Sequence, residues 1–155
     1  MRRTLALDVG DKTIGLALSD PFGWTAQGLE TIRRTILRED LSKLRAIVER
    51  CEVETFVVGL PKNMNGTEGE RCQMVGAFAK HLRAEFPSIE IVFWDERLST
   101  VAAERSLLEA DLSRAKRKKV IDKMAAVYIL QGYLDSIALK GANNVEEEKQ
   151  SGGAD

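Results

Sequence analysis

Two acidic positions interrupt or follow strand-like segments, where carboxylates are uncommon. Asp8 interrupts the apolar run Leu5–Val9, and aspartate is depleted in strands. Asp95 and Glu96 directly follow a second apolar run, Ile91–Trp94, at the carboxyl end where open α/β sheets keep their ligand sites. Both have ordinary explanations: a strand-end acid bonded to the next turn, and a solvated acidic pair. Because adjacent strand residues point to opposite faces, only one acid of the pair should converge with Asp8.

A third acid, Asp122, lies on the apolar stripe of a predicted final helix. Steps of three, four and seven residues lead from it to Ala125, Ala126 and Ile129, so it shares the face that packs on the sheet. A carboxylate is unusual on such a face unless a cation neutralises it. The ordinary alternative is a first-turn acid that complements the helix dipole.

Together these acids predict a metal site. The first strand, the last strand and the final helix are far apart in sequence, but their acidic ends could meet on one side of a sheet. Converging carboxylates repel one another unless cations neutralise them, and oxygen-only ligands select hard ions such as Mg²⁺ or Mn²⁺. Two such ions activate water and stabilise the leaving oxygen in phosphodiester cleavage. The acids therefore predict a metal-dependent nuclease of the two-metal type.

A basic run just before Asp122 points to a polyanionic partner. Residues 114–119 hold five bases in six positions. Such a run is usually a solvated surface, but its place beside a candidate catalytic acid favours contact with a nucleic-acid backbone. The predicted phosphate-binding residues in this run are Lys116, Arg117, Lys118 and Lys119.

The elements that must position these residues are three strands followed by helix, strand, helix, strand, helix and helix. The predicted strands are Thr4–Val9, Ile14–Ser19, a segment within Gln27–Arg34, Thr55–Leu60 and Ile89–Trp94. The predicted helices are an apolar stripe over 37–48, a segment ending near Phe86, one capped by Ser99 or Thr100, and Val120–Leu139. This order predicts an α/β fold of RNase H-like type: a five-stranded mixed sheet, with an antiparallel meander and then parallel crossovers, flanked by helices. Each half of an actin-like kinase shares that layout.

The loop at 61–69 has two interpretations. Its backbone N–H groups could lie against phosphate, or Thr67 and Glu70 could form a capping box that only starts the next helix.

Length and composition predict one soluble domain, residues 1–140, followed by a disordered acidic tail, residues 141–155. The chain has 155 residues, 44% hydrophobic and 30% charged, with a net charge of −1. No apolar run approaches the roughly 20 residues that span a bilayer, and no signal peptide begins the chain. Cys51 and Cys72 lack metal-ligand spacing, which fits reduced thiols in a cytoplasmic protein without membrane contact.

Four motifs give the chain a resemblance to the YqgF/RuvX family of bacterial RNase H-like nucleases, also described as Holliday junction resolvases. They are spread over residues 5 to about 139, nearly the whole ordered chain, in the family's order. They are Leu7–Ala17, Val57–Gly69, Asp95–Thr100 and Asp122–Ala126.

The resemblance implies a fold related to the resolvase RuvC and a role in maturing the 5′ end of the small-subunit ribosomal RNA precursor. It places metal-binding acids at Asp8, Asp122 and the 95–96 pair. We favour Glu96, with Asp95 as a further ligand or a support for one. The predicted catalytic residues are therefore Asp8, Glu96 and Asp122. Further substrate contacts are predicted within the motifs at Lys12, Asn63, Asn65, Thr67 and Arg97.

Three alternatives remain open at this point. A DNA junction resolvase needs two active sites and hence a homodimer. An actin-like phosphate binder pairs two similar halves, and this chain is long enough for only one. The third is an RNA-binding accessory protein without catalysis, against which the intact set of acids argues.

Overall fold

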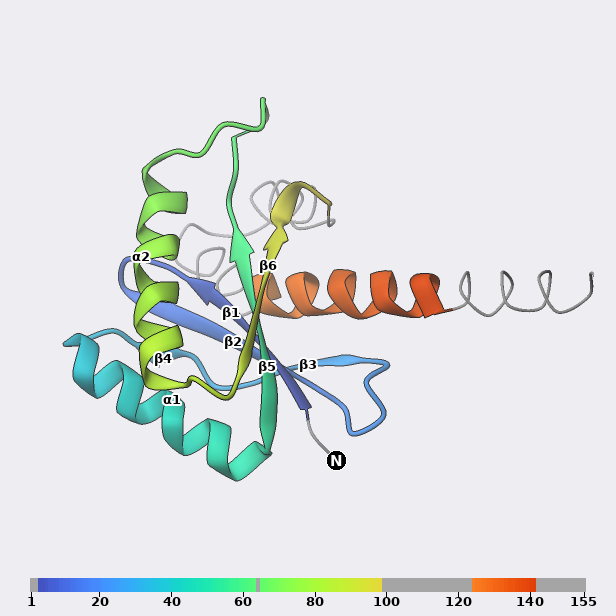
Figure 1. Cartoon of the computed structure of the whole chain (residues 1–155), viewed down its shortest axis with the longest axis horizontal. Helices are drawn as coiled ribbons and strands as arrows, with labels where there is room; N and C mark the ends of the chain where they lie inside the picture. The colour runs from blue at the N-terminus through green and yellow to red at the C-terminus, as the bar shows by residue number, and fades with distance from the viewer. Residues whose placement is uncertain (1–2, 64, 99–123, 142–155) are drawn as a thin grey trace, which may run out of the picture.

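A six-stranded mixed sheet forms the centre of the computed structural model, which describes residues 3–63, 65–98 and 124–141 (Figure 1). The sheet order is β3-β2-β1-β5-β6, and β4 also pairs with β2. The strands are β1 (Arg3–Val9), β2 (Thr13–Ser19), β3 (Ala26–Gly28), β4 (Ile32–Arg33), β5 (Val53–Leu60) and β6 (Glu90–Asp95). The helices are α1 (Leu37–Cys51), α2 (Glu70–Glu85), the short 3-10 helix η1 (Glu96–Leu98), and a C-terminal helix over residues 124–141.

The strand directions confirm the predicted topology. β1 and β2 are antiparallel, whereas β1 and β5, and β5 and β6, are parallel. Parallel neighbours need a crossover connection, and α1 and α2 supply the two that are required. As a result, the carboxyl ends of β1, β5 and β6 lie along one edge of the sheet.

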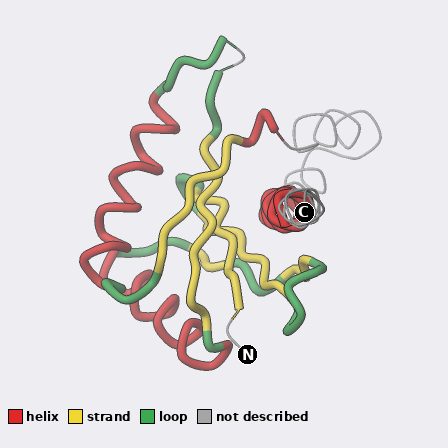
Figure 2. The backbone as a smooth tube through the Cα atoms, turned by 45° about the vertical axis from the view of Figure 1, so that its right-hand side comes forward, coloured by secondary structure: helices red, strands yellow, loops and turns green. Residues whose placement is uncertain are grey.

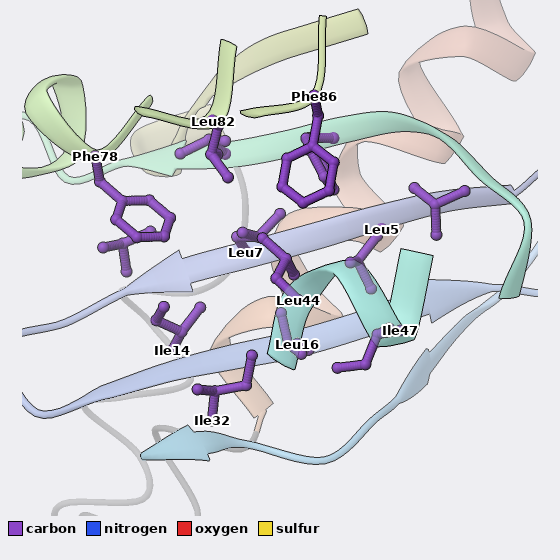
Figure 3. Packing of buried hydrophobic residues seen from close by; sticks show 14 of the residues in the cluster. Leu5, Leu7, Ile14, Leu16, Ile32, Leu44, Ile47, Phe78, Leu82 and Phe86 are labelled. Carbon is purple, nitrogen blue, oxygen red and sulfur yellow. The ribbon is translucent and has the colours of Figure 1, made fainter. Parts of the chain in front are cut away.

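Helices cover both faces of the sheet. α1 and α2 pack on one face and the C-terminal helix packs on the other (Figure 2). Alternate residues of β1 therefore enter different cores. Leu5 and Leu7 face α1 and α2, in the larger core seen in Figure 3, while Ala6 faces the C-terminal helix. That helix contributes Ala125, Ala126, Ile129, Leu130 and Leu134 to the second core.

The single third strand expected within Gln27–Arg34 is two short strands. Ala17 lies opposite Gly28 and Ile14 opposite Ile32, so three steps along β2 match four steps along the partner. One extra residue therefore interrupts the pairing as a β-bulge, which sequence periodicity does not reveal. The sheet consequently has six strands where five were expected.

The predicted capping box at α2 is wrong. Gly69 is the residue before the helix, and no side chain bonds to the helix start. The Thr67 hydroxyl donates instead to Asn65 Oδ1 at 2.6 Å. The Thr67 hydroxyl oxygen, which a capping box would bond to the start of α2, is thus engaged in hydrogen bonds within the loop.

Four predicted features lie outside the residues that the structure describes: the helix after Ser99 or Thr100, the basic run 114–119, Asp122 and the acidic tail beyond Gly141. Among the described helices, none combines the length and the apolar character that crossing a membrane requires.

Candidate functional site

Asp8 lies near the carboxyl end of β1, on the face of the sheet that the C-terminal helix covers. Its neighbours Leu7 and Val9 face the core beneath α1 and α2, so strand alternation turns Asp8 the other way, like Ala6. The residue is half-buried and stands opposite Gly15 of β2. Asp8 takes part in at least one polar or electrostatic interaction within the protein.

Glu96 approaches the same face from the end of β6. It is the first residue of η1, and only 8% of it is exposed. A Cβ atom placed on Gly59 of β5 would lie 3.1 Å from Glu96 Oε1, so the carboxylate sits directly over this glycine. Because Leu7 pairs with Val58, the next residues, Asp8 and Gly59, are neighbours across the β1–β5 pair. The structure therefore brings Asp8 and Glu96 to one face, on either side of β5.

The C-terminal helix closes over the same point. The Cβ position on Gly59 would lie 2.5 Å from Ile129 Cδ1 and 3.3 Å from Ile129 Cγ1. Ala125 and Ala126, one turn earlier, are also buried, as the predicted stripe requires. Asp122 belongs to that stripe by sequence spacing but lies outside the described residues.

Strand alternation separates Asp95 from Glu96. Trp94 faces the C-terminal helix, whereas Phe93 lies against Arg83 of α2, so Asp95 follows Phe93 to the α2 side. There Arg97 binds both carboxylate oxygens, with Nη2 donating to Oδ2 at 2.6 Å. Hydrogen bonding from the Arg97 side chain lowers the pKa of Asp95 below its usual value. The Asp95 carboxylate is therefore paired with the Arg97 guanidinium on the face of the sheet that α2 covers.

The loop at 61–69 is stabilised by its own polar side chains. Asn63 Nδ2 donates to Thr67 Oγ1 at 3.0 Å, and Asn65 Oδ1 accepts from both the backbone N–H and the hydroxyl of Thr67. Gly66 has a φ of 86° and lies against Arg97, whose Nη1 would be 3.4 Å from a Cβ there. The predicted substrate residues Asn63, Asn65 and Thr67 thus bond to one another, and Arg97 connects their loop to Asp95.

No group of three or more histidine, cysteine, aspartate or glutamate side chains with metal-binding geometry occurs among residues 3–63, 65–98 and 124–141. Asp8 and Glu96 place two carboxylates on one face in this part of the chain. Carboxylate oxygens are the donors that hard divalent ions prefer, so the donor set fits such an ion once a third acid joins it.

Comparison with known proteins places the chain in a family. A family model described as "RuvX: Holliday junction resolvase" matches residues 2–136. The chain belongs to the RuvX family. A relative from Moorella thermoacetica, named "Putative pre-16S rRNA nuclease", is 60% identical over 139 residues, which cover 90% of this chain and 99% of the relative. A protein of the same name from Clostridium tetani is 56% identical over 135 residues, covering 87% and 97%.

The fold comparison agrees with this assignment. Thermus thermophilus RuvC in complex with a Holliday junction substrate superposes with a TM-score of 0.52 at 13% identity, covering 88% of this chain and 96% of that one. At this identity the likeness concerns the fold alone, and it confirms the predicted relation to RuvC. Family membership, with the names of the relatives, confirms that this RuvX member is a nuclease and binds nucleic acid.

Sequence reasoning missed two residues that organise the RuvX site. Arg34 donates from its backbone N–H to the carbonyl of Lys12 and from Nη1 to that of Gly10, both at 2.8 Å. Its Nε lies 3.7 Å from the buried Asp40 carboxylate of α1. Arg34 therefore fixes the turn that follows Asp8 and carries the exposed Lys12. These are contacts across the fold, so no local pattern signals them.

Gly59 is the other missed residue, and it did carry a signal. A glycine within an otherwise apolar, buried strand often marks a close approach of another group. Here two groups approach: the carboxylate of Glu96 and the side chain of Ile129.

We predict that Gly59→Ala lowers both stability and cleavage, and that the two losses can be separated. The added methyl overpacks against Ile129, which typically costs about 1–3 kcal/mol, and it also displaces the Glu96 carboxylate. Adding Ile129→Val removes the Cδ1 atom and should restore most of the melting temperature, but cleavage should stay impaired because the Glu96 contact remains. Gly76→Ala is the matched control, since no atom lies within 4 Å of its Cβ position. If the double variant regains full cleavage together with stability, Gly59 does not position Glu96.

Proposed function

We propose that this RuvX member is a metal-dependent nuclease that hydrolyses phosphodiester bonds in the precursor of 16S ribosomal RNA, maturing its 5′ end in the cytoplasm. The names of its relatives support the substrate, because identities of 56–60% extend over nearly their whole length. One structural observation carries the catalytic part: the buried Glu96 carboxylate lies over Gly59 on the face that Asp8 shares.

We propose Asp8, Glu96 and Asp122 as the residues that hold Mg²⁺ or Mn²⁺. Burying a carboxylate is unfavourable unless opposite charge or hydrogen bonds compensate it, and two acids on one face add mutual repulsion. A divalent cation relieves both costs. Asp122 is three, four and seven residues before Ala125, Ala126 and Ile129, which all face this site, and this spacing supports its inclusion.

The divalent ions, when bound, supply Lewis acidity for attack of water on the phosphodiester and for departure of the leaving oxygen. The chain's own residues prepare that reaction. Asp8 approaches from β1 and Glu96 from the start of η1, directly after β6, on either side of Gly59, so both carboxylates are held at or next to a strand of the sheet. Ile129 packs over Gly59 beside the Glu96 carboxylate, and Ile129 and Trp94 belong to the apolar core on this face.

We propose that cationic and polar groups around this edge of the sheet bind the phosphate backbone of the substrate. Lys12 is exposed in the turn after β1, which Arg34 stabilises. Asn63, Asn65 and Thr67 present a rigid polar loop at the end of β5. Arg97 is bound to Asp95 and lies against Gly66. We therefore propose that Arg97 aids substrate binding by supporting the loop that contacts the substrate. The basic run at 116–119 completes the phosphate contacts.

A second candidate function is cleavage of branched DNA. The family description and the fold of RuvC with its junction substrate favour it. Such an activity would need two sites and therefore a homodimer. Single-stranded RNA, duplex RNA and a four-way DNA junction, offered to the same preparation with Mn²⁺, separate the two functions, because the ribosomal role requires that an RNA be cut.

We predict that Asp8→Asn, Glu96→Gln and Asp122→Asn each leave a folded protein that has lost RNA cleavage. Each substitution keeps the shape of the side chain and removes its charge. The loss should exceed the roughly 10–100-fold cost of removing a residue that only supports a metal ligand. Cleavage rate and circular dichroism, measured on the same samples, provide the test.

Asp95→Asn is the matched control for these variants, because it removes a charge that lies one residue from Glu96 but on the other face. It should retain most of the activity. A normal rate in Glu96→Gln combined with a lost rate in Asp95→Asn would reverse our choice within the pair. Full activity in Asp8→Asn would contradict the site as a whole.

We predict that changing Lys116, Arg117, Lys118 and Lys119 to alanine weakens RNA binding for every sequence. Phosphate contacts carry no base information, and each lost contact should flatten the plot of log affinity against log salt by about 0.7–0.9. The control removes four exposed bases from α1 and α2, on the face away from the site: Arg38, Lys43, Arg71 and Lys80. A wild-type salt slope in the first variant would show that the substrate enters elsewhere.

A further inference from the structure

Two aromatic side chains project into solvent from the turn between β2 and β3. Phe22 is 67% exposed and Trp24 is 75% exposed, and their ring centroids are 5.8 Å apart. Side chains of this size normally bury most of their surface, so a neighbouring exposed pair indicates a binding surface.

The turn that carries the rings is held rigid by its own polar groups. Asp20 Oδ1 accepts hydrogen bonds from the backbone N–H groups of Trp24 at 2.7 Å and Thr25 at 2.9 Å. The Asp20 carbonyl also accepts from the N–H of Gly23, whose φ of 75° suits glycine. The backbone that carries the two rings is therefore held by hydrogen bonds that leave the rings themselves exposed.

Gln131 of the C-terminal helix fastens the turn to the rest of the molecule. Its Oε1 accepts from the N–H of Ala26 at 3.0 Å, and its Nε2 donates to the carbonyl of Trp24 at 3.1 Å. Asp135 orients the same amide through a 2.9 Å hydrogen bond. Little conformational entropy remains to be lost when a ligand meets the rings, which favours binding.

We propose that Phe22 and Trp24 form a stacking platform for unpaired bases of nucleic acid bound outside the cleavage site. Aromatic side chains bind single strands in this way because every base has a flat π-face. The proposal rests on the nuclease function proposed above, since that function supplies the ligand class.

The surroundings of the turn fit a nucleic-acid strand. A cavity of about 250 Å³ adjoins Pro21, and its other lining residues are Arg3, Arg50, Cys51 and Glu52. Arg50 is ion-paired with Glu30 at 2.9 Å. Arg3, the other cation that lines the cavity, has no ion pair among the described residues. Arg3 shares this cavity with Pro21, the residue before Phe22, and a guanidinium near a stacking surface can bind the phosphate that adjoins a stacked base.

The size of the patch argues for a base rather than a protein partner. Two aromatic side chains offer at most about 300–500 Å². A stable protein interface needs about 800 Å² from each partner. The exposed Pro21 adds a small apolar area, whereas the adjacent Asp20, Thr25 and Gln27 are polar.

The platform lies at the end of β1 that is far from Asp8. β1 runs from Arg3 to Val9, with Asp8 near its far end, and the backbone N–H of Thr4 donates to the hydroxyl of Ser19, the last residue of β2. Five residues of strand span roughly 16 Å. The bases on Phe22 and Trp24 therefore belong to a flank of the substrate and not to the bond that is cut.

Tryptophan fluorescence tests the platform directly, because the chain has two tryptophans and only Trp24 is exposed. The full-length protein is titrated in EDTA with an unstructured single-stranded RNA and with the same sequence as a duplex. We expect the single strand to quench the emission and the duplex to do so much less. Trp24→Ala should remove the quenching and weaken single-strand binding, measured by anisotropy of labelled RNA, by about 5- to 150-fold, as for one stacked base.

Matched variants distinguish stacking from other causes. Phe22→Ala should weaken binding while leaving the Trp24 signal, Trp24→Phe should restore affinity, and Leu139→Ala, an equally exposed apolar residue on the C-terminal helix, should have no effect. Wild-type affinity in Trp24→Ala overturns the proposal, as does emission that changes with protein concentration alone, which would indicate a second copy on the rings. Binding in EDTA needs no cleavage, so RNA that is bound but never cut would count against the proposed nuclease function and not against the platform.

Discussion

The contact that Glu96 and Ile129 share with the bare backbone of Gly59 joins the two layers of the molecule at the candidate site. A side chain at this point of β5 would meet the helix at 2.5 Å and the carboxylate at 3.1 Å. Its absence lets the C-terminal helix pack closely on the sheet and gives a buried acid its place beside Asp8. The same glycine thus serves helix packing and the carboxylate site, and a change there affects both.

The alternation of strand residues divides the acids between two environments. On one face, Leu5, Leu7 and Phe56 build an apolar core beneath α1 and α2. On the other, small residues such as Ala6 and Ala17 leave room for the C-terminal helix, and Asp8 and Glu96 lie at its border. Asp95, one residue from Glu96, turns to the first face and is neutralised by Arg97. Two adjacent acids therefore have different chemistry for a geometric reason.

Sequence periodicity was enough to predict the mixed sheet and its crossovers. The helical spacing also predicted the buried Ala125, Ala126 and Ile129 of the C-terminal helix. It did not predict the buried Leu130 and Leu134, and it placed on the same stripe Ile137, which is 46% exposed. The bulge between β3 and β4, the bonds of Thr67 within its loop and the hold of Arg34 on the β1–β2 turn were not predictable. Each depends on hydrogen bonds whose partners cannot be identified from the local sequence.

Calorimetric titration with Mg²⁺ and Mn²⁺ tests the central claim most directly, because it measures the carboxylate site without requiring a substrate. The account predicts binding to the wild-type chain that Asp8→Asn and Glu96→Gln each weaken by at least about tenfold. It predicts wild-type affinity in Asp95→Asn, whose carboxylate faces Arg97 on the other side of the sheet. Equal affinities in the wild type, Asp8→Asn and Glu96→Gln would contradict it.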